Sequence, residues 1–452
     1  MNPQIFREYD IRGVADRDLP DELARDLGRA LGTVLAERGK KRVAVGRDPR
    51  VSSRRLRNAL IEGLVETGRH VVKLEVGPTP LTYFAVHHLD TDGGVMVTGS
   101  HNPPEDNGFK ILIGKETLYG QDIRALRERI ERREFVQLPG GAVDRAEVGP
   151  RYVRWMKGNV HPARTDLRFV VDAGNGAGGP LALATLRALG FDPEALYCEM
   201  DGTFPNHHPD PTMPENLEAL IRRVRDTGSV VGIAYDGDAD RLGAVDANGD
   251  IVWGDKLLVA FSRAVLDRHP GAAVLGEVKC SQTLYDDITA HGGRAIMWKT
   301  GHSLIKAKMK QEGALLAGEM SGHLFFADRY FGYDDAIYAS LRLLELLAER
   351  GGTLGSLLAD VPTTFVTPEL RVPCPDEVKF RVVSRVLEHY RATHPVADVD
   401  GARINFGDGW GLVRASNTQP VLVLRFEAQS EVRRDALRSE VEAVVQAARA
   451  EG

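Results

Sequence analysis

Residues 42–76 read RVAVGRDPRVSSRRLRNALIEGLVETGRHVVKLEV, and this stretch decides the fold class. It predicts an apolar strand at 42–46, an amphipathic helix at 56–66 and a second apolar strand at 71–76. Continuous apolar strands are typical of sheets that helices cover on both faces. The same alternation of strands and helices, punctuated by short Gly and Pro turns, continues along the chain and indicates an α/β protein.

The chain has 452 residues, which is too long for one hydrophobic core, since cores stop growing near roughly 250–300 residues. The loose stretch QLPGGAVDRAEVGP at 137–150 and the segment GGTLGS at 351–356 indicate two of the boundaries. We expect four domains, at 1–147, 148–250, 251–361 and 362–452. The first three contain strand–helix units of similar size, so they are candidates for a shared topology. The turn DANGD at 246–250 predicts a hairpin of type I′, in which both central residues need a positive φ.

Composition excludes several classes of protein. The 58 basic and 64 acidic residues give a net charge of −6, which argues against a nucleic acid or an anionic membrane as the main partner. Cys198, Cys280 and Cys374 match no metal-ligand spacing and no disulfide framework, as expected in a reducing cytosol. The beginning MNPQIFREYD has no apolar signal-peptide core, and no apolar run approaches about 18 residues. We therefore expect a cytoplasmic protein.

The stretch TGSHNPP at 98–104 is a candidate catalytic loop. It follows an apolar strand, and ligands bind at the carboxyl ends of strands in α/β sheets. Asn102 precedes a proline and therefore avoids the helical conformation, which favours a tight turn. Ser100, one residue past a glycine, can be presented on that turn as a nucleophile. The alternative is an ordinary turn with an incidental serine.

The stretch DGDADR at 236–241 is a candidate metal loop. Its three carboxylates, Asp236, Asp238 and Asp240, alternate along the chain and repel one another unless a cation lies between them. An EF-hand is excluded, because its sixth position is Arg241 and its twelfth is Ala247. Three carboxylates with room for a phosphate oxygen suit Mg²⁺, and a solvated acidic turn is the alternative.

Two further polar loops have weaker signals. GEMSGH at 318–323 offers a carboxylate and a hydroxyl that can bind sugar hydroxyls, or it is a polar hairpin turn. RASNTQP at 414–420 offers an arginine and short donors that can hold a phosphate, or it is a plain loop before a strand.

The stretch DAGNGAGGP at 172–180 supports a different class of enzyme. It contains G-x-G-x-x-G between a strand and a helix, and Asp192 lies about 20 residues further on, as in a dinucleotide-binding oxidoreductase. That alternative leaves the serine loop, the three aspartates and the arginine loop unexplained, so a structural turn is favoured. A nucleophile, a metal, a sugar-binding loop and a phosphate-binding loop, one in each domain, are together what phosphoryl transfer to a sugar requires.

These motifs, in this order, resemble the α-D-phosphohexomutase superfamily and within it the bacterial phosphomannomutase/phosphoglucomutases. Further matches are FREYDIRG at 6–13, VGRDPR at 45–50, NGFKI at 107–111, DGTFPNHHPDP at 201–211, WKTGHSLIK at 298–306 and PVLVLRFEA at 420–428. The likeness covers residues 6 to about 428. It implies three related α/β domains with mixed sheets and a smaller C-terminal α+β domain around a central cleft.

The resemblance also implies a role for each loop. Ser100 carries the phosphoryl group and, with Asp236, Asp238 and Asp240, binds Mg²⁺. The other implied site residues are His101, Lys110 and His302 for catalysis, Glu319, Ser321, His323, Arg241, Lys279 and Tyr9 for the sugar, and Arg414, Ser416, Asn417, Thr418 and Arg12 for phosphate. Lys110 and His302 are both candidates for acid–base work. Position 239 is alanine where many relatives have glycine, which predicts a slightly stiffer metal loop.

The reaction implied is reversible phosphoryl transfer between C1 and C6 of mannose and glucose phosphates, through a phosphoserine and a hexose 1,6-bisphosphate that also serves as activator. Met320 favours mannose and glucose over glucosamine, so phosphoglucosamine mutase is the main alternative. A non-enzymatic sugar-phosphate binder is disfavoured by the intact serine and aspartates. Hexose phosphates are the expected partners, and the protein is expected to be a monomer or a homodimer.

Overall fold

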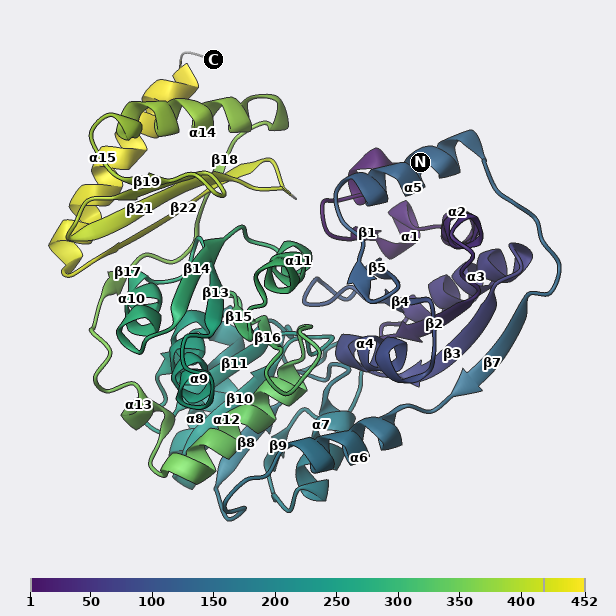
Figure 1. Cartoon of the computed structure of the whole chain (residues 1–452), viewed down its shortest axis with the longest axis horizontal. Coiled ribbons are helices and arrows are strands. Elements are labelled where there is room, and N and C mark those ends of the chain that lie inside the picture. The colour runs from purple at the N-terminus through teal and green to yellow at the C-terminus, as the bar shows by residue number, and fades with distance from the viewer. Residues whose placement is uncertain (1, 418, 451–452) are drawn as a thin grey trace.

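The computed structural model describes residues 2–417 and 419–450 and contains four sheets, each with its own helices (Figure 1). The strands of the first domain are β1 (Ile11–Val14), β2 (Arg42–Arg47), β3 (His70–Val76), β4 (Gly93–Val97), β5 (Asp106–Ile113), β6 (Glu116–Thr117) and β7 (Ala142–Ala146). Its helices are η1 (Pro3–Ile5), α1 (Ala15–Asp18), α2 (Asp21–Glu37), α3 (Ser53–Glu66), α4 (Thr79–His88) and α5 (Gln121–Arg132).

The second and third domains are built in the same way. The second contains α6 (Gly149–Asn159), β8 (Phe169–Asp172), α7 (Gly179–Ala188), β9 (Glu194–Leu196), η2 (Pro214–Leu217), α8 (Glu218–Thr227), β10 (Val231–Tyr235), β11 (Leu242–Asp246) and β12 (Ile251–Val252). The third contains α9 (Gly254–Arg268), β13 (Ala273–Glu277), α10 (Gln282–Ala290), β14 (Arg294–Trp298), α11 (His302–Glu312), β15 (Leu316–Gly318), β16 (Leu324–Phe326), α12 (Ala336–Arg350) and α13 (Leu354–Leu357).

One topology recurs in these three domains, as the sequence had suggested. The strand orders β3-β2-β4-β5, β9-β8-β10-β11 and β14-β13-β15-β16 are equivalent. In each, the first three strands are parallel and the last is antiparallel to its neighbour. The connection from the third strand to the antiparallel fourth strand therefore begins at the carboxyl end of the parallel strands in every one of these sheets. This repeated connection carries the candidate loops described below.

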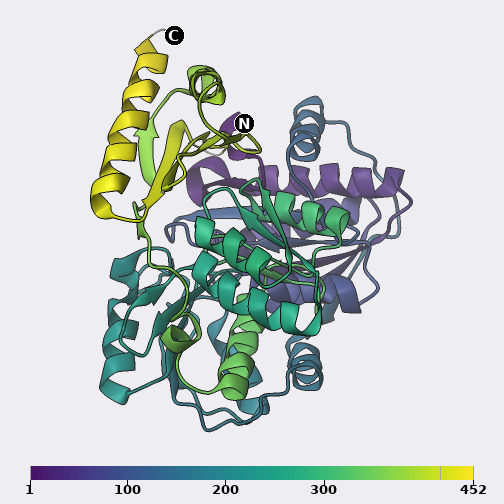
Figure 2. The ribbon, with the colours of Figure 1, turned by 60° about the vertical axis from the view of Figure 1, so that its left-hand side comes forward.

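The fourth domain has a different architecture. It contains β17 (Phe365–Val366), β18 (Leu370–Pro373), α14 (Asp376–Arg391), β19 (Val396–Ala397), β20 (Ala402–Asn405), β21 (Gly409–Ala415), β22 (Val421–Ala428) and α15 (Glu431–Ala450). All of its strand pairs are antiparallel, and both long helices lie on one face of the sheet (Figure 2). Arg403 and Arg425 tie it to the third domain, since they donate to the carbonyl oxygens of Val278 at 2.6 Å and Lys279 at 2.7 Å.

Local sequence explains where several helices begin and end. The Asp335 carboxylate accepts from the N–H of Tyr338 at the start of α12, and the Ser281 hydroxyl accepts from Thr283 at the start of α10. Helices α8 and α11 end at Gly228 and Gly313, both with φ of 62°. Glycine adopts this left-handed conformation without the steric penalty of a side chain.

Two local predictions from the sequence are wrong. The stretch 137–150, expected to be loose, contains β7, an edge strand parallel to β3 whose residues 142–145 are all exposed, as suits the border of a sheet. The hairpin at Asp246 is real, but of its two central residues Gly249 alone has a positive φ, of 87°. The N–H of Gly249 donates to the carbonyl of Asp246 at 3.0 Å, which fits a type I turn followed by a glycine bulge.

Candidate functional site

The equivalent connections of the three related domains bring the first three polar loops together. Ser100 follows β4, Asp236 to Arg241 follow β10, and Glu319 to His323 follow β15. Each of these strands is the third strand of the repeated order and pairs with the antiparallel fourth strand. Contacts between the loops, described next, place them at the meeting point of the domains. The fourth loop, at 414–420, joins β21 to β22 in the C-terminal domain.

Ser100 is buried and points toward the acidic loop of the second domain. Its hydroxyl donates to Oδ2 of Asp236 at 3.0 Å and lies 3.1 Å from Nδ1 of His101. Its φ of 50° is left-handed, which is uncommon for a residue with a side chain. Burial, followed by the nearby Arg241 and Arg12, lowers the pKa of His101, so its imidazole is neutral.

Asp236, Asp238 and Asp240 are all fully buried and are held by groups of the first domain. The Lys110 ammonium donates to Oδ2 of Asp238 at 2.8 Å and also to Asp240, and the Thr79 hydroxyl donates to Asp238. These contacts join the loop of the second domain to β5 and α4 of the first. Ala239 in this loop has a φ of 55°, a conformation that is more costly for alanine than for glycine.

The charges of this cluster are coupled. Burial raises the pKa of Asp236 well above its usual range, and the neighbouring charges of Asp238 and Asp240 raise it further. Burial opposes ionisation of Asp238 as well, but the charge and hydrogen bond of Lys110 hold its pKa below the usual range. Burial would lower the pKa of Lys110, yet Asp238 and Asp240 raise it. One lysine therefore leaves the three carboxylates incompletely neutralised.

The three aspartates fit a hard divalent cation. Each offers one oxygen, and these oxygens lie within 4.8 Å of one another. Oδ1 of Asp238 and Oδ1 of Asp240 are buried without a hydrogen-bond partner among residues 2–417 and 419–450. A buried, unpaired carboxylate oxygen is costly unless a cation or a donor meets it. Carboxylate oxygens beside a serine hydroxyl are the kind of ligands that such cations prefer.

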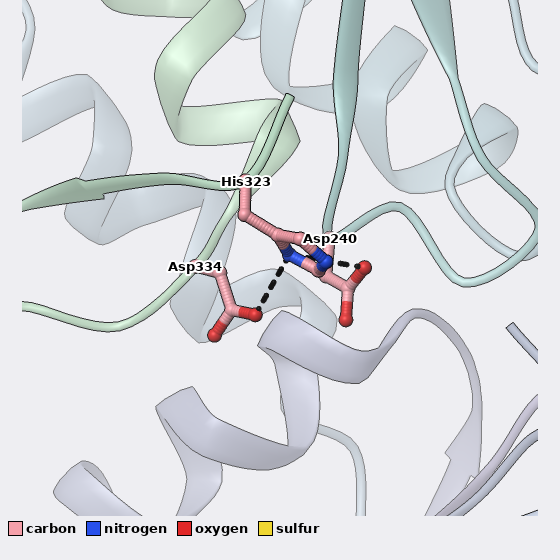
Figure 3. A group of neighbouring side chains, drawn as sticks. All are labelled: Asp240, His323 and Asp334. Atoms are coloured by element: carbon pink, nitrogen blue, oxygen red, sulfur yellow. Dashed lines mark ion pairs between the residues drawn. The ribbon is translucent and has the colours of Figure 1, made fainter. Parts of the chain in front are cut away.

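His323 links the acidic loop to the third domain (Figure 3). Nε of Arg241 donates to its Nε2 at 3.0 Å, so the proton of a neutral His323 ring lies on Nδ1. Nδ1 is 3.1 Å from Oδ2 of Asp334 and 3.6 Å from Oδ1 of Asp240. These three residues are close enough to hold a metal, but a protonated Nδ1 cannot ligate one. The cluster therefore orients His323 and, through it, the guanidinium of Arg241.

His302 lies beside His323 at the beginning of α11. The two rings are stacked with centroids 5.6 Å apart, and the ring of Tyr9 lies 6.2 Å from His302 on another side. Burial, followed by the charge of Lys306, lowers the pKa of His302 well below its usual value. Its ring is therefore neutral at pH 7 and can accept a proton.

Tyr9 connects this cluster to a second group of predicted residues. Its hydroxyl donates to the carbonyl of Thr300 at 2.9 Å and accepts from Nδ2 of Asn417 at 2.9 Å. It therefore joins the first, third and fourth domains. The N–H of Thr300 donates to Oδ2 of Asp400 at 3.1 Å, and the same oxygen accepts from Nε of Arg414 at 3.1 Å.

Of the remaining predicted residues, Glu319 contacts the segment of Thr300 and Arg12 contacts the loop of Ser100. Glu319 accepts from the N–H of Gly301 at 2.7 Å, and burial raises its pKa. Lys279 forms an ion pair with Glu369 at 3.1 Å. Arg12 donates to Oδ1 of Asn102 at 2.9 Å, next to Ser100. Ser321 is half-buried on the 318–323 turn, Ser416 accepts from the N–H of Gln419 at 3.2 Å, and Thr418 lies outside the described residues.

The glycine-rich stretch 172–180 has a structural role. The N–H of Ala177 donates to the carbonyl of Gly237 at 2.9 Å. A Cβ added at Gly176 would lie 2.8 Å from that same oxygen. The glycines therefore let this turn lie directly against the acidic loop, and the dinucleotide-binding alternative loses its main support.

Sequence reasoning assigned no role to Thr79, Asp334 and Lys306. Thr79 contacts Asp238, and Lys306 donates to Oδ1 of Asp334 at 3.1 Å. Two of them could have been found from the sequence. Lys306 is the last residue of the quoted stretch WKTGHSLIK, and Thr79 follows the end of a predicted strand. Asp334 had no signal, because its place beside His323 depends on how α12 packs against the second domain.

Comparisons with known proteins find similarity along most of the chain. Models of the phosphoglucomutase/phosphomannomutase α/β/α domains I, II and III match residues 3–137, 150–249 and 253–365, and the model of the C-terminal domain matches residues 369–444. The chain is 48% identical over 428 residues to a phosphomannomutase/phosphoglucomutase of Pseudomonas putida and 46% identical to one of Pseudomonas aeruginosa. Both alignments cover 94% of this chain and 92% of the relative.

A crystal structure of a phosphoglucomutase/phosphomannomutase family protein from Burkholderia thailandensis is similar throughout. It superposes with a TM-score of 0.94 at 40% sequence identity, covering 99% of this chain and 98% of that one. Among the described residues, no helix combines the length and the apolar character that crossing a membrane requires.

Proposed function

The chain belongs to the phosphoglucomutase/phosphomannomutase family, and from this premise we propose how its residues share the reaction. It is an isomerase that interconverts hexose phosphates by moving a phosphoryl group between C1 and C6. Ser100 is the proposed nucleophile. The observation that carries this assignment is the bond from its hydroxyl to Asp236, inside a cluster of three buried aspartates.

In the proposed forward step, phosphorylated Ser100 gives its phosphoryl group to the free hydroxyl of the sugar. The bond between Oγ and phosphorus breaks, a bond from the sugar oxygen to phosphorus forms, the hydroxyl proton leaves to a base, and Oγ of Ser100 takes up a proton to regenerate the serine hydroxyl. His302 is the better candidate for that base, because its ring is neutral, whereas Lys110 is held as an ammonium by two carboxylates. The bisphosphate then reorients and returns its other phosphoryl group to Ser100.

Asp236, Asp238 and Asp240 are the proposed ligands of Mg²⁺, together with an oxygen of the phosphorylated serine. When bound, the cation would stabilise the negative charge that develops during phosphoryl transfer. Lys110 and Thr79 keep Asp238 in place from the first domain, and Arg241 is held beside the loop by His323.

Glu319 and Ser321 are the proposed sugar-binding residues, with His323, Arg241, Lys279 and Tyr9 around them. Arg414, Ser416, Asn417 and Thr418 would hold the phosphate that does not react, with Arg12 near the one that does. The fourth domain carries the phosphate loop, and its contact with Tyr9 supports a role in closing over the substrate.

Substrate range is tested by coupled assays with mannose 1-phosphate, glucose 1-phosphate and glucosamine 1-phosphate, each with a hexose 1,6-bisphosphate as activator. We expect turnover of the first two at much higher kcat/KM than of the third. A preference for glucosamine 1-phosphate would make the chain a phosphoglucosamine mutase instead. We also propose domain limits at residues 147/148, 250/251 and 361/362, a cytoplasmic location, no nucleic-acid partner and a monomeric or homodimeric state.

The variants Arg414→Ala and Glu319→Gln test the proposed roles of the phosphate loop and the sugar loop one at a time. Both should impair glucose and mannose substrates, because these sugars differ only at C2. Loss of the charge-assisted bond from Arg414 is expected to cost roughly 1.5–3 kcal/mol, or about 10- to 150-fold in kcat/KM. Arg414→Lys serves as the control that keeps the charge but loses the forked geometry.

A ligand without phosphate distinguishes the two loops. Weak binding of free glucose, followed by NMR, should survive Arg414→Ala and fall in Glu319→Gln. The opposite pattern would show that the two roles are exchanged.

A further inference from the structure

The conformation of Ser100 needs support from its surroundings. A serine with a φ of 50° persists only where neighbouring groups determine the backbone. The turn itself supplies two bonds: the N–H of Ser100 donates to the Thr98 hydroxyl at 2.8 Å, and the N–H of Asn102 donates to the carbonyl of Gly99 at 2.9 Å. These bonds do not hold the carbonyl groups of Ser100, Asn102 and Asp106, which need another partner.

Arg50, from the stretch VGRDPR, orients them. Its side chain is completely buried, and each of its five N–H donors has an acceptor. Nη2 donates to the carbonyl oxygens of Ser100 at 2.7 Å and Asn102 at 2.6 Å, and Nη1 donates to that of Asp106 at 3.0 Å and to that of Pro103. One guanidinium thus binds four carbonyls of the loop that carries Ser100.

Asp48 completes this arrangement from the same strand end. Its Oδ2 accepts from Nε of Arg50 at 3.1 Å and from the N–H of Gly99 at 3.3 Å. Its Oδ1 accepts from the N–H of Arg50 at 3.1 Å and from the Ser53 hydroxyl. The buried guanidinium therefore has a carboxylate partner that contacts the serine loop as well.

Gly99 makes room for the guanidinium. A Cβ at this position would lie 2.6 Å from both Cζ and Nε of Arg50 and 2.7 Å from the carbonyl oxygen of Asp106. Real Cβ atoms do not approach other atoms that closely, so any larger residue would push Arg50 away from the loop. The close approach of Arg50 thus explains why residue 99, directly before Ser100, is a glycine.

The second domain closes over Arg50 from the other side. The ring of Phe204 lies 4.9 Å from its Cζ, as in a cation–π contact. A Cβ at Gly202 would lie 2.5 Å from Cα of Arg50, so this loop packs against its backbone. Residues 201–206 belong to the quoted stretch DGTFPNHHPDP, to which no function was attached. Arg50 is therefore clamped between the serine loop and the domain that carries the aspartates.

We propose that Arg50 is a positioning residue for phosphoryl transfer: by binding four carbonyls it fixes the left-handed turn that aims the Ser100 hydroxyl at Asp236. This inference rests on the proposed role of Ser100 as nucleophile. It assigns one purpose to the stretches VGRDPR and DGTFPN, namely holding the nucleophile rigidly against the metal loop. A lysine cannot replace Arg50, because three donors on one nitrogen cannot reach four separate carbonyls.

The test follows phosphoryl uptake by the dephosphorylated enzyme from glucose 1,6-bisphosphate, using rapid quenching and mass spectrometry of the Ser100 peptide. In this step a bond from a sugar oxygen to phosphorus breaks, the bond from Oγ to phosphorus forms, and the serine proton passes to the released sugar oxygen. Arg50→Lys should slow uptake about 100-fold, the size of effect expected from a displacement of about 1 Å. Affinity for glucose 6-phosphate should stay unchanged, because other residues bind the substrate.

Two further variants keep the test decisive. Arg57→Lys is the matched control, since Arg57 is also buried in the first domain but donates to the carbonyl of Leu74, away from the serine loop. It should take up phosphate at the wild-type rate. Gly99→Ala retains the charge of Arg50 but displaces its guanidinium, and should slow uptake as Arg50→Lys does. If a thermal unfolding measurement shows that Arg50→Lys does not fold, the uptake rate of Gly99→Ala decides whether Arg50 positions the serine loop.

Wild-type uptake rates in both Arg50→Lys and Gly99→Ala would overturn the proposal while leaving Ser100 as the nucleophile. Equal slowing in Arg57→Lys would also overturn it, because the effect would then reflect general damage to the domain. If the wild-type enzyme takes phosphate at a residue other than Ser100, the proposed function fails first, and the role of Arg50 fails with it.

Discussion

The Ser100→Ala variant is expected to lose on the order of 10⁴-fold or more in turnover, because no neighbouring side chain can replace the nucleophile. Ser100 is buried, and its hydroxyl lies between Asp236 and His101, next to the three aspartates proposed to bind the cation. Purified wild-type protein should carry phosphate on Ser100 in part of the population. Steady-state assays and intact-mass measurements check both expectations.

The control for this variant is Ser262→Ala. Ser262 is likewise buried, but its hydroxyl donates to the carbonyl of Val259 within α9. Its loss should leave turnover nearly unchanged, and both variants should unfold near the wild-type temperature. Near-normal turnover of Ser100→Ala, with phosphate found only elsewhere, would show that the nucleophile is another residue.

Removal of the divalent cation is expected to abolish activity, and Mg²⁺ should restore it. Asp238→Asn should lower both the rate and the apparent affinity for Mg²⁺, with a loss in kcat of about 10²-fold or more. The reason is that Lys110 holds the pKa of Asp238 below its usual range, and that Asp238 binds Lys110 and Thr79 through one oxygen while the other is unpaired. An amide would remove the charge and present an N–H at one of these positions.

Asp246→Asn is the matched control for this prediction. Asp246 is a buried carboxylate of the same domain, and its Oδ1 accepts from two backbone N–H groups of the β11–β12 turn. Asparagine retains that acceptor, so activity and Mg²⁺ dependence should be preserved. Full activity of the wild-type enzyme in excess chelator would exclude a role for a divalent cation.

The sequence predicted the fold class, the four-domain division and the strand-end position of each polar loop. These features depend on local signals: apolar strands, Gly and Pro turns, and polar residues that directly follow strands. The resemblance to a family supplied the proposed roles of individual residues, such as sugar binding for Glu319. Local pattern alone ranked GEMSGH and RASNTQP no higher than ordinary turns.

Other features depended on contacts between distant parts of the chain. The edge strand β7 has exposed residues and no apolar pattern, so it is visible only when it pairs with β3. Arg50 lies in the charged stretch VGRDPR, yet its side chain is completely buried, with residues 201–206 packed against it. Asp334 and Lys306 meet across a turn and a helix of the third domain, and no spacing in the sequence announces that contact.

The bond between Tyr9 and Asn417 bears on how the protein exchanges its ligands. Charged arginines of the C-terminal domain donate to backbone carbonyls of the third domain, whereas the bond between Asn417 and Tyr9 of the first domain joins two neutral groups. A neutral hydrogen bond contributes about 0.5–1.5 kcal/mol net, which corresponds to a population ratio of roughly 2 to 13. Forms in which the C-terminal domain contacts Tyr9 and forms in which it does not should therefore coexist in the protein without ligand. Binding of the anionic ligand would shift the population between these two forms. A sugar with two phosphate groups, one to engage at each end, would then stay bound longest.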